Sequence, residues 1–153
     1  MCTKWLINSA MIVGLDQLTK YLSVRYLSFN QDFPVLPGFD LTLRHNTGAA
    51  FSFLANASGW QRWFFILLAL TMSVIIYFWL RRLSPQAKQE GFALSLILGG
   101  ALGNFIDRLV HGYVIDFILL HYQRWEWPAF NIADSAICIG AILLLPSLWK
   151  KSP

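Results

Sequence analysis

Residues 63–80 contain no charged side chain and are almost entirely aliphatic or aromatic. A helix of about 20 apolar residues crosses the roughly 30 Å hydrocarbon core of a lipid bilayer. Three other segments come close but carry a few charges, and the whole chain is 56% hydrophobic and only 13% charged, unlike an ordinary soluble domain. We therefore expect a single domain over residues 1–153, an all-α membrane protein with four transmembrane helices at approximately 5–27, 60–80, 91–110 and 130–149.

The basic residues predict how these helices are oriented. The net charge is +4, but the basic side chains are scattered or lie at the ends of apolar segments, so we expect no nucleic-acid binding. Cytoplasmic loops of membrane proteins are enriched in lysine and arginine. One side would carry Lys4, Arg81, Arg82, Lys88, Lys150 and Lys151, against Arg44 and Arg124 in the connections of the other. Both termini are therefore expected in the cytoplasm.

Two aspartates, Asp116 and Asp134, lie at the outer end of the expected bundle. A carboxylate near hydrocarbon costs about 2.5 to 3.5 kcal/mol, so it needs a partner or a task. The helix dipole alone could explain Asp134, in the first turn of the last helix. Asp116 has no such explanation, because residues 113–118 form an apolar, strand-like run. Paired, the two carboxylates could share one proton and hydrolyse a peptide bond.

Further polar residues are spaced so that they share helix faces. Asp16 and Lys20 are four residues apart, which predicts either a buried ion pair that holds helices together or part of a functional site. Other polar residues at helical spacing occupy the outer half of the third helix and the start of the fourth: Asn104, Asp107, Arg108, Asn131 and Asp134. A charge-balanced helix end would equally explain the third-helix pair.

The two outer connections, residues 28–59 and 111–129, are long enough to hold structure of their own. Residues 41–44 alternate between apolar and polar, and residues 113–118 are rich in β-branched and aromatic side chains. We therefore expect a small sheet on the outer membrane surface.

Other hydrolytic chemistries lack the residues that they need. The histidines His45, His111 and His121 form no HExxH pattern for zinc, and Cys2 and Cys138 form no CxxC pair. No GxSxG turn marks a serine nucleophile. We expect no metal and no cofactor, which leaves the carboxylates.

Five short motifs in fixed order resemble those of the bacterial lipoprotein signal peptidases, also called signal peptidase II. They are residues 16–20 (DQLTK), 46–51 (NTGAAF), 103–108 (GNFIDR), 114–117 (VIDF) and 130–134 (FNIAD). Each string alone is a weak signal. Their order over the whole chain makes the resemblance specific.

The resemblance implies a membrane aspartic endopeptidase of the bacterial inner membrane, with four transmembrane helices, a small periplasmic β-cradle and a short surface helix. Its substrate would be a diacylglyceryl-modified prolipoprotein, cut on the periplasmic side, at the amino side of the lipidated cysteine. Asp116 and Asp134 match the catalytic pair of the family. Supporting polar residues match Asp16, Lys20, Asn46, Asn104, Asp107, Arg108 and Asn131. We further expect a monomer that contacts membrane lipid.

Two other functions compete with peptide hydrolysis. Buried charges also mark the ion paths of small proton- or ion-coupled transporters. Transport usually needs polar groups through the depth of the membrane, whereas here they gather at the outer side, apart from Asp16 and Lys20 nearer the middle. A membrane scaffold without enzymatic activity would leave Asp116 and Asp134 unexplained.

Near the second motif, Gly48, Ala49 and Ala50 are small enough for a substrate to approach, and we expect Phe51 and Phe53 to form an apolar wall beside them.

Overall fold

A computed structural model describes residues 2–48 and 59–149 of the chain. These residues form four helices and a four-stranded sheet. The helices are α1 (Cys2–Tyr26), α2 (Trp60–Arg82), α3 (Lys88–Val110) and α4 (Ile132–Trp149). The strands are β1 (Phe33–Leu36), β2 (Phe39–Asn46), β3 (Val114–Tyr122) and β4 (Trp125–Glu126). The expected apolar wall of Phe51 and Phe53 lies outside the described residues, as do Ala49 and Ala50 beside it.

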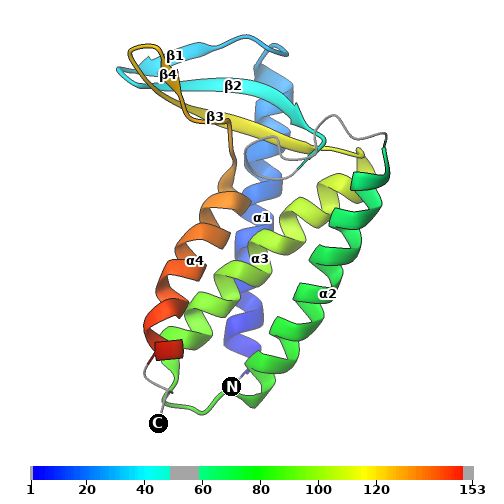
Figure 1. Ribbon diagram of the computed structural model, residues 1–153, viewed down its shortest axis with the longest axis vertical. Helices are drawn as coiled ribbons and strands as arrows, with labels where there is room; N and C mark the ends of the chain where they lie inside the picture. The colour runs from blue at the N-terminus through cyan, green and yellow to red at the C-terminus, as the bar shows by residue number, and fades with distance from the viewer. Residues whose placement is uncertain (1, 49–58, 150–153) are drawn as a thin grey trace.

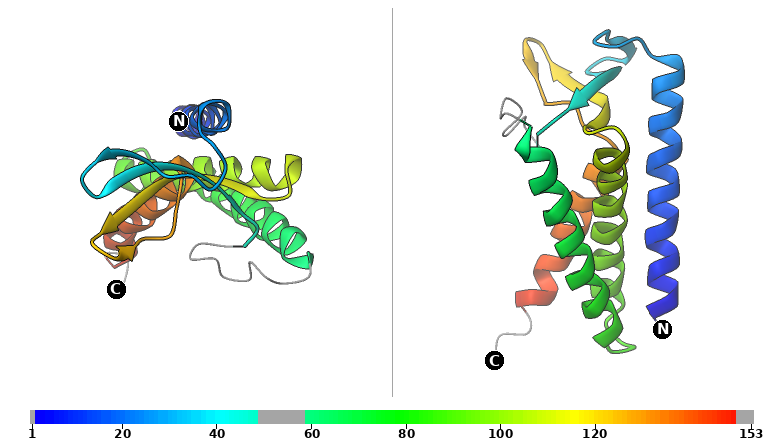
Figure 2. Two further views of the ribbon diagram at one scale, coloured as in Figure 1. Left: turned by 90° about the horizontal axis from the view of Figure 1, so that it is seen from above. Right: turned by 90° about the vertical axis from the view of Figure 1, so that its right-hand side faces the viewer.

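Helix α3 is the centre of the bundle and packs against α1, α2 and α4 (Figures 1 and 2). Glycines allow these close approaches. A Cβ atom added at Gly103 would lie 2.5 Å from Asp16 Oδ2 on α1, and one at Gly100 would clash with the Ala133 carbonyl oxygen at the start of α4. The backbone of α3 therefore lies directly against polar groups of both neighbouring helices.

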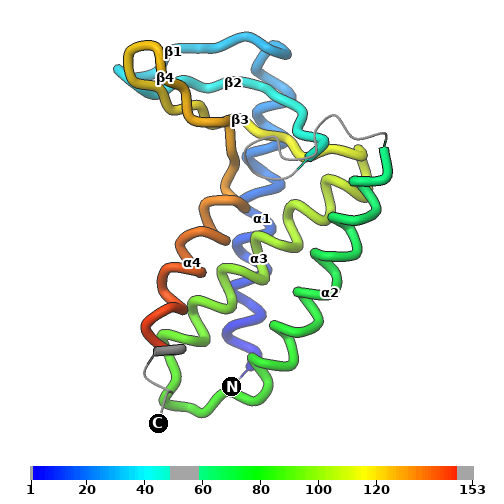
Figure 3. The backbone as a smooth tube through the Cα atoms, viewed as in Figure 1, coloured from blue at the N-terminus to red at the C-terminus, as the bar shows by residue number. Residues whose placement is uncertain are grey.

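The sheet covers the end of the bundle opposite the start of α1 (Figures 1 and 3). Its strands run antiparallel in the order β1-β2-β3-β4. Strand β2 contains the predicted segment 41–44, and β3 contains residues 114–118 of the predicted segment 113–118. In their register, Arg44 pairs with Asp116. Strands β1 and β4 were not predicted, because one is short and contains Pro34 and the other has only two residues.

The outside of the bundle is apolar and its inside is polar. On α2, Trp63 and Leu67 are each more than 60% exposed, whereas Asp16, Lys20 and Asn131 are at most 1% exposed. Among the described residues, α2 and α3 are long and apolar enough to cross a membrane by length and composition. Helix α4 contributes a shorter apolar stretch, Ile132–Ser147. This surface suits lipid better than water.

The contact between α3 and α4 gives a test of this packing. Replacement Gly100→Ala should destabilise the fold by about 1 to 3 kcal/mol, because the new methyl group meets the backbone of Ala133. Gly14→Ala is the matched control: it is also helical, and an added Cβ atom meets nothing within 4 Å. Thermal unfolding in detergent measures both. Equal melting temperatures for the two variants would contradict such close packing of α3 on α4.

Candidate active site

Asp116 lies in β3, a strand of the sheet, and is 2% exposed. Its neighbours Val114, Ile115 and Phe117 are also buried, so this part of the strand has no solvent-facing side. Amide groups satisfy both of its carboxylate oxygens: Asn46 Nδ2 donates to Oδ2 at 3.0 Å and Asn131 Nδ2 donates to Oδ1 at 2.7 Å. Three separate parts of the chain therefore meet at this carboxylate.

Asp134 lies in the first turn of α4, and Asn131 joins it to Asp116. The Asp134 backbone N–H donates to Asn131 Oδ1 at 2.9 Å, which is the bond that an asparagine makes when it caps a helix. The same Asn131 side chain donates to Asp116. On the other side, Asn104 Nδ2 of α3 donates to Asp134 Oδ1 at 2.7 Å. One helix-capping side chain thus fixes both aspartates.

The surroundings of Asp116 stabilise its protonated form relative to that of an ordinary aspartate. Burial in a poorly solvated site, and then the charge of Asp134, raise the pKa of Asp116 from 3.8 to about 7. The amide donors of Asn46 and Asn131 act in the opposite direction but are outweighed. Two carboxyl groups in this environment can hold one proton between them near neutral pH.

Lys20 is the cation at the centre of the polar core. Its ammonium group lies 2.8 Å from both Asp16 Oδ2 and Asp107 Oδ2 and donates to Asn104 Oδ1 at 3.0 Å. Because the Asn104 oxygen faces the ammonium group, its NH₂ group faces Asp134. Lys20 therefore determines which end of the Asn104 amide meets the candidate catalytic carboxylate.

The two carboxylates beside Lys20 also hold the backbone of the candidate catalytic segments. Asp16 Oδ1 accepts a hydrogen bond from the backbone N–H of Ala133 at 2.9 Å, one residue before Asp134. Asp107 Oδ2 accepts one from the backbone N–H of Ile115 at 3.1 Å, one residue before Asp116. The Asp16–Lys20 ion pair predicted from sequence is therefore present, and it is joined to both aspartate-bearing segments.

Arg108 completes the predicted set on the side of α2. Its Nη2 donates to the carbonyl oxygen of Gly48 at 2.7 Å, and its guanidinium group lies 5.0 Å from the ring centre of Phe65. Within the described residues, its Nε is buried without a hydrogen-bond partner. The negative charges of Asp134 and Asp116 act favourably on this guanidinium group.

Gln17 belongs to the same polar network, although it was not among the predicted site residues. Its Nε2 donates to Asp107 Oδ1 at 2.9 Å, and to Asp16 Oδ2 and the Gly103 carbonyl oxygen at 3.2 Å each. Its position next to Asp16 and three residues before Lys20 was the available signal. All nine predicted site residues lie in this one connected region: Asp16, Lys20, Asn46, Asn104, Asp107, Arg108, Asp116, Asn131 and Asp134.

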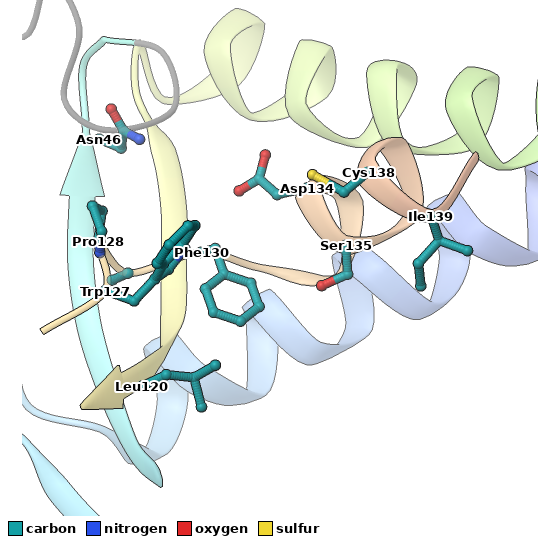
Figure 4. A pocket seen from close by; sticks show the side chains of 10 residues that line it. Asn46, Leu120, Trp127, Pro128, Phe130, Asp134, Ser135, Cys138 and Ile139 are labelled. Atoms are coloured by element: carbon teal, nitrogen blue, oxygen red, sulfur yellow. The ribbon is translucent and has the colours of Figure 1, made fainter. Parts of the chain in front are cut away.

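A cavity of about 360 Å³ opens beside Asp134 (Figure 4). Its walls are mainly apolar and come from β3, the segment before α4 and α4 itself: Leu120, Trp127, Pro128, Ala129, Phe130, Ser135, Cys138 and Ile139. Asn46 and Asp134 lie in the upper part of Figure 4, above the apolar side chains of Phe130 and Leu120. Among residues 2–48 and 59–149, no group of three or more His, Cys, Asp or Glu side chains could hold a metal ion.

The fold and this site define a class: a membrane enzyme whose polar core surrounds a pair of aspartates. A protein-family model described as "Signal peptidase (SPase) II" matches residues 8–150. The lipoprotein signal peptidase of Teredinibacter turnerae is 54% identical over 142 residues, covering 93% of this chain and 84% of that protein. That of Pseudomonas aeruginosa is 51% identical over 149 residues, covering 96% of this chain and 88% of that protein.

The fold is also similar to those of solved bacterial membrane enzymes. One, described as a bacterial membrane enzyme structure obtained by the in meso method at 2.3 Å resolution, superposes with a TM-score of 0.85 at 32% identity and covers 97% of this chain and 88% of that chain. A second bacterial membrane enzyme structure, at 1.9 Å resolution, gives a TM-score of 0.84 at 31% identity and covers 98% of this chain and 95% of that chain. The chain belongs to the signal peptidase II family.

The raised pKa of Asp116 predicts how stability depends on pH. Between pH 3.8 and about 7 the folded protein keeps a proton on Asp116 that the unfolded chain has released, so the free energy of unfolding should fall as pH rises through this range. Asp116→Asn should remove this part of the slope and leave the variant relatively more stable above pH 7. Unfolding in detergent across this pH range measures the effect.

Asp32→Asn is the control for that experiment. Asp32 is an exposed aspartate that pairs with Arg44, and a hydrogen bond with Thr42 is the main cause that lowers its pKa. Its stabilising effect is present at neutral pH and is lost only as pH falls through that lowered value. The slope near neutral pH should therefore survive in Asp32→Asn. An unchanged slope in Asp116→Asn would show that Asp116 is already ionised throughout this range.

Proposed function

We propose that this protein is a membrane aspartic endopeptidase that removes the signal peptide from diacylglyceryl-modified prolipoproteins, cutting on the amino side of the lipidated cysteine. The observation that carries the proposal is the placement of Asp116 and Asp134. One side chain, Asn131, is bonded to both, and Asp134 opens on an apolar cavity. The names of the relatives supply the substrate class, since those proteins are lipoprotein signal peptidases.

The reaction needs one proton on the aspartate pair. The ionised carboxylate takes a proton from a water molecule while the water oxygen attacks the scissile carbonyl carbon. The protonated carboxyl donates its proton to the carbonyl oxygen, which becomes a hydroxyl of the tetrahedral intermediate. When the C–N bond breaks, the first carboxyl passes its proton to the departing amine, and the hydroxyl returns a proton to the second carboxylate. The pair is then restored without a covalent intermediate.

The other polar residues position this pair. Asn46, Asn104 and Asn131 hold the carboxylate oxygens by their amide groups. Lys20, Asp16 and Asp107 hold the backbone segments that carry the aspartates, as the bonds to Ala133 and Ile115 indicate. Arg108 supplies a positive charge near both aspartates. These contacts keep the pair in place when substrate replaces water.

The cavity beside Asp134 supports a lipid-bearing substrate. Its walls are mainly aromatic and aliphatic, and it lies where α4 meets the sheet (Figures 1 and 4). In the proposed orientation this level is the outer leaflet, where the diacylglyceryl group of a prolipoprotein places its cysteine. Enzyme and scissile bond would then meet at one depth.

The proposed location is the bacterial inner membrane, with four transmembrane helices, both termini in the cytoplasm and the site on the periplasmic side. Basic residues support this orientation, because the helix ends far from the sheet carry four of them: Lys4, Arg81, Arg82 and Lys88. The buried charges of α1 are compatible with a spanning helix because Lys20 and Asp16 pair with each other inside the bundle. A monomer contains every residue that the mechanism uses.

Cleavage of matched precursor peptides tests the proposal. Purified protein in detergent should release the signal peptide from a diacylglyceryl-modified precursor and leave the unlipidated precursor intact. Asp116→Asn and Asp134→Asn should each lower the rate by about 10⁴-fold, as loss of an essential acid–base group does. The rate should fall because the amide cannot accept or donate the catalytic proton, whereas the nearly unchanged side-chain volume should leave the fold intact.

Asp32→Asn is again the control, because Asp32 is an exposed residue of the sheet end that pairs with Arg44. It should cleave at the wild-type rate. All variants should be compared at equal amounts of folded protein, measured by size-exclusion chromatography in detergent. Full activity of either Asp116→Asn or Asp134→Asn would rule out the aspartate pair, and cleavage of the unlipidated precursor at the same rate would rule out the substrate class.

A further inference from the structure

We propose that Arg62, in the first turn of α2, is a positioning residue of the active site that acts through Arg108. It holds the last turn of α3, which carries Arg108 and Asp107, against the start of α2. The inference rests on the proposed peptidase function and adds to it a residue outside the set that the motifs indicate.

Arg62 binds the carboxyl end of α3 with two hydrogen bonds. Its Nε donates to the carbonyl oxygen of Arg108 at 3.0 Å and its Nη2 donates to that of Leu109 at 3.0 Å. The last carbonyl groups of a helix lack N–H partners within the helix, although that of Arg108 also accepts a hydrogen bond from the backbone N–H of Gly112 at 3.2 Å. A cation beside these carbonyl groups is favoured by the helix dipole. The planar guanidinium group offers both donors in one fixed arrangement, which a lysine ammonium group cannot reproduce.

The structure leaves room for this contact and braces it. Gly112, just beyond α3, has a φ of +86°, and a Cβ atom there would lie 3.3 Å from Arg62 Nη1. The Arg62 guanidinium group also lies over the Trp63 ring, 5.3 Å from its centre. The side chain is therefore flanked by the turn after α3 on one side and by Trp63 of its own helix on another.

The same face of α2 reaches both the backbone and the side chain of Arg108. Arg62 binds its carbonyl oxygen, and Phe65, three residues further along α2, lies 5.0 Å from its guanidinium group. Arg108 in turn donates to the carbonyl oxygens of Gly48 and Asn104. A shift of α3's last turn would move all of these contacts together.

This turn matters to the aspartates through two groups. The guanidinium group of Arg108 interacts electrostatically with Asp116 and Asp134. Asp107, one residue earlier, holds the backbone N–H of Ile115 next to Asp116. Misplacement of catalytic groups by about 1 Å can lower a rate by about a hundredfold, so a residue that fixes this turn can affect catalysis without touching substrate.

Single and double variants distinguish a positioning role of Arg62 from simple stabilisation of the fold. Arg62→Met should lower kcat, by up to about a hundredfold, with little change in KM, because Arg62 is not among the residues that line the cavity beside Asp134. Arg62→Lys keeps the charge but not the paired donors and should recover only part of the rate. Arg25→Met, at the exposed outer end of α1, is the control and should cleave at the wild-type rate.

The decisive comparison repeats Arg62→Met in an Arg108→Lys background. If Arg62 acts in part through the Arg108 side chain, its replacement should lower kcat by a smaller factor there than in the wild type, with the remainder carried by Asp107 and its bond to Ile115, so the two losses are less than additive. Additive losses, or an Arg62→Met protein that melts earlier but keeps wild-type kcat per folded molecule, would overturn the proposal. If Arg62→Met yields too little folded protein, the same comparison is made with Arg62→Lys. Failure of the wild type to cleave the lipidated precursor would instead contradict the peptidase function.

Discussion

The ammonium group of Lys20 is the interaction on which the polar core depends. Its two carboxylate partners, Asp16 and Asp107, also bind the backbone N–H groups of Ala133 and Ile115, which precede the two candidate catalytic aspartates. Buried charges are costly unless each is paired and hydrogen-bonded. Here one cation satisfies two anions, and each anion then fixes one segment of the site. Removing the cation would leave two uncompensated carboxylates inside the bundle.

The site concentrates groups that would each destabilise an ordinary core. Asp116 is buried beside another carboxylate, and its raised pKa is the direct expression of that cost. The apolar bundle around it supplies the compensating stability, because α3 packs closely on its neighbours at glycines such as Gly100 and Gly103. A carboxylate that resists ionisation is also what peptide hydrolysis by an aspartate pair requires. In the proposed mechanism, the chain therefore gives up some stability at the aspartate pair.

The sequence predicted local features well and long-range contacts poorly. Helical spacing indicated the Asp16–Lys20 pair, and residue types indicated the strands that became β2 and β3. Spacing could not show that Asp16 reaches the start of α4, because that bond joins residues 117 apart in the chain. Gln17 and Arg62 were not assigned to the site for the same reason: their partners lie on α3, and only the folded chain brings them together. The resemblance to a family, rather than geometry, supplied the substrate.

The proposed sharing of one proton by Asp116 and Asp134 can be tested directly by infrared spectroscopy. In the wild-type protein, the carbonyl stretch of one protonated carboxyl group should be present below neutral pH and should disappear as pH rises through about 7. Asp116→Asn should abolish this band, because the pair can no longer hold the proton on that carboxyl group. A wild-type spectrum without this band, or a band that persists unchanged in Asp116→Asn, would show that the two aspartates do not share a proton and would contradict the proposed mechanism.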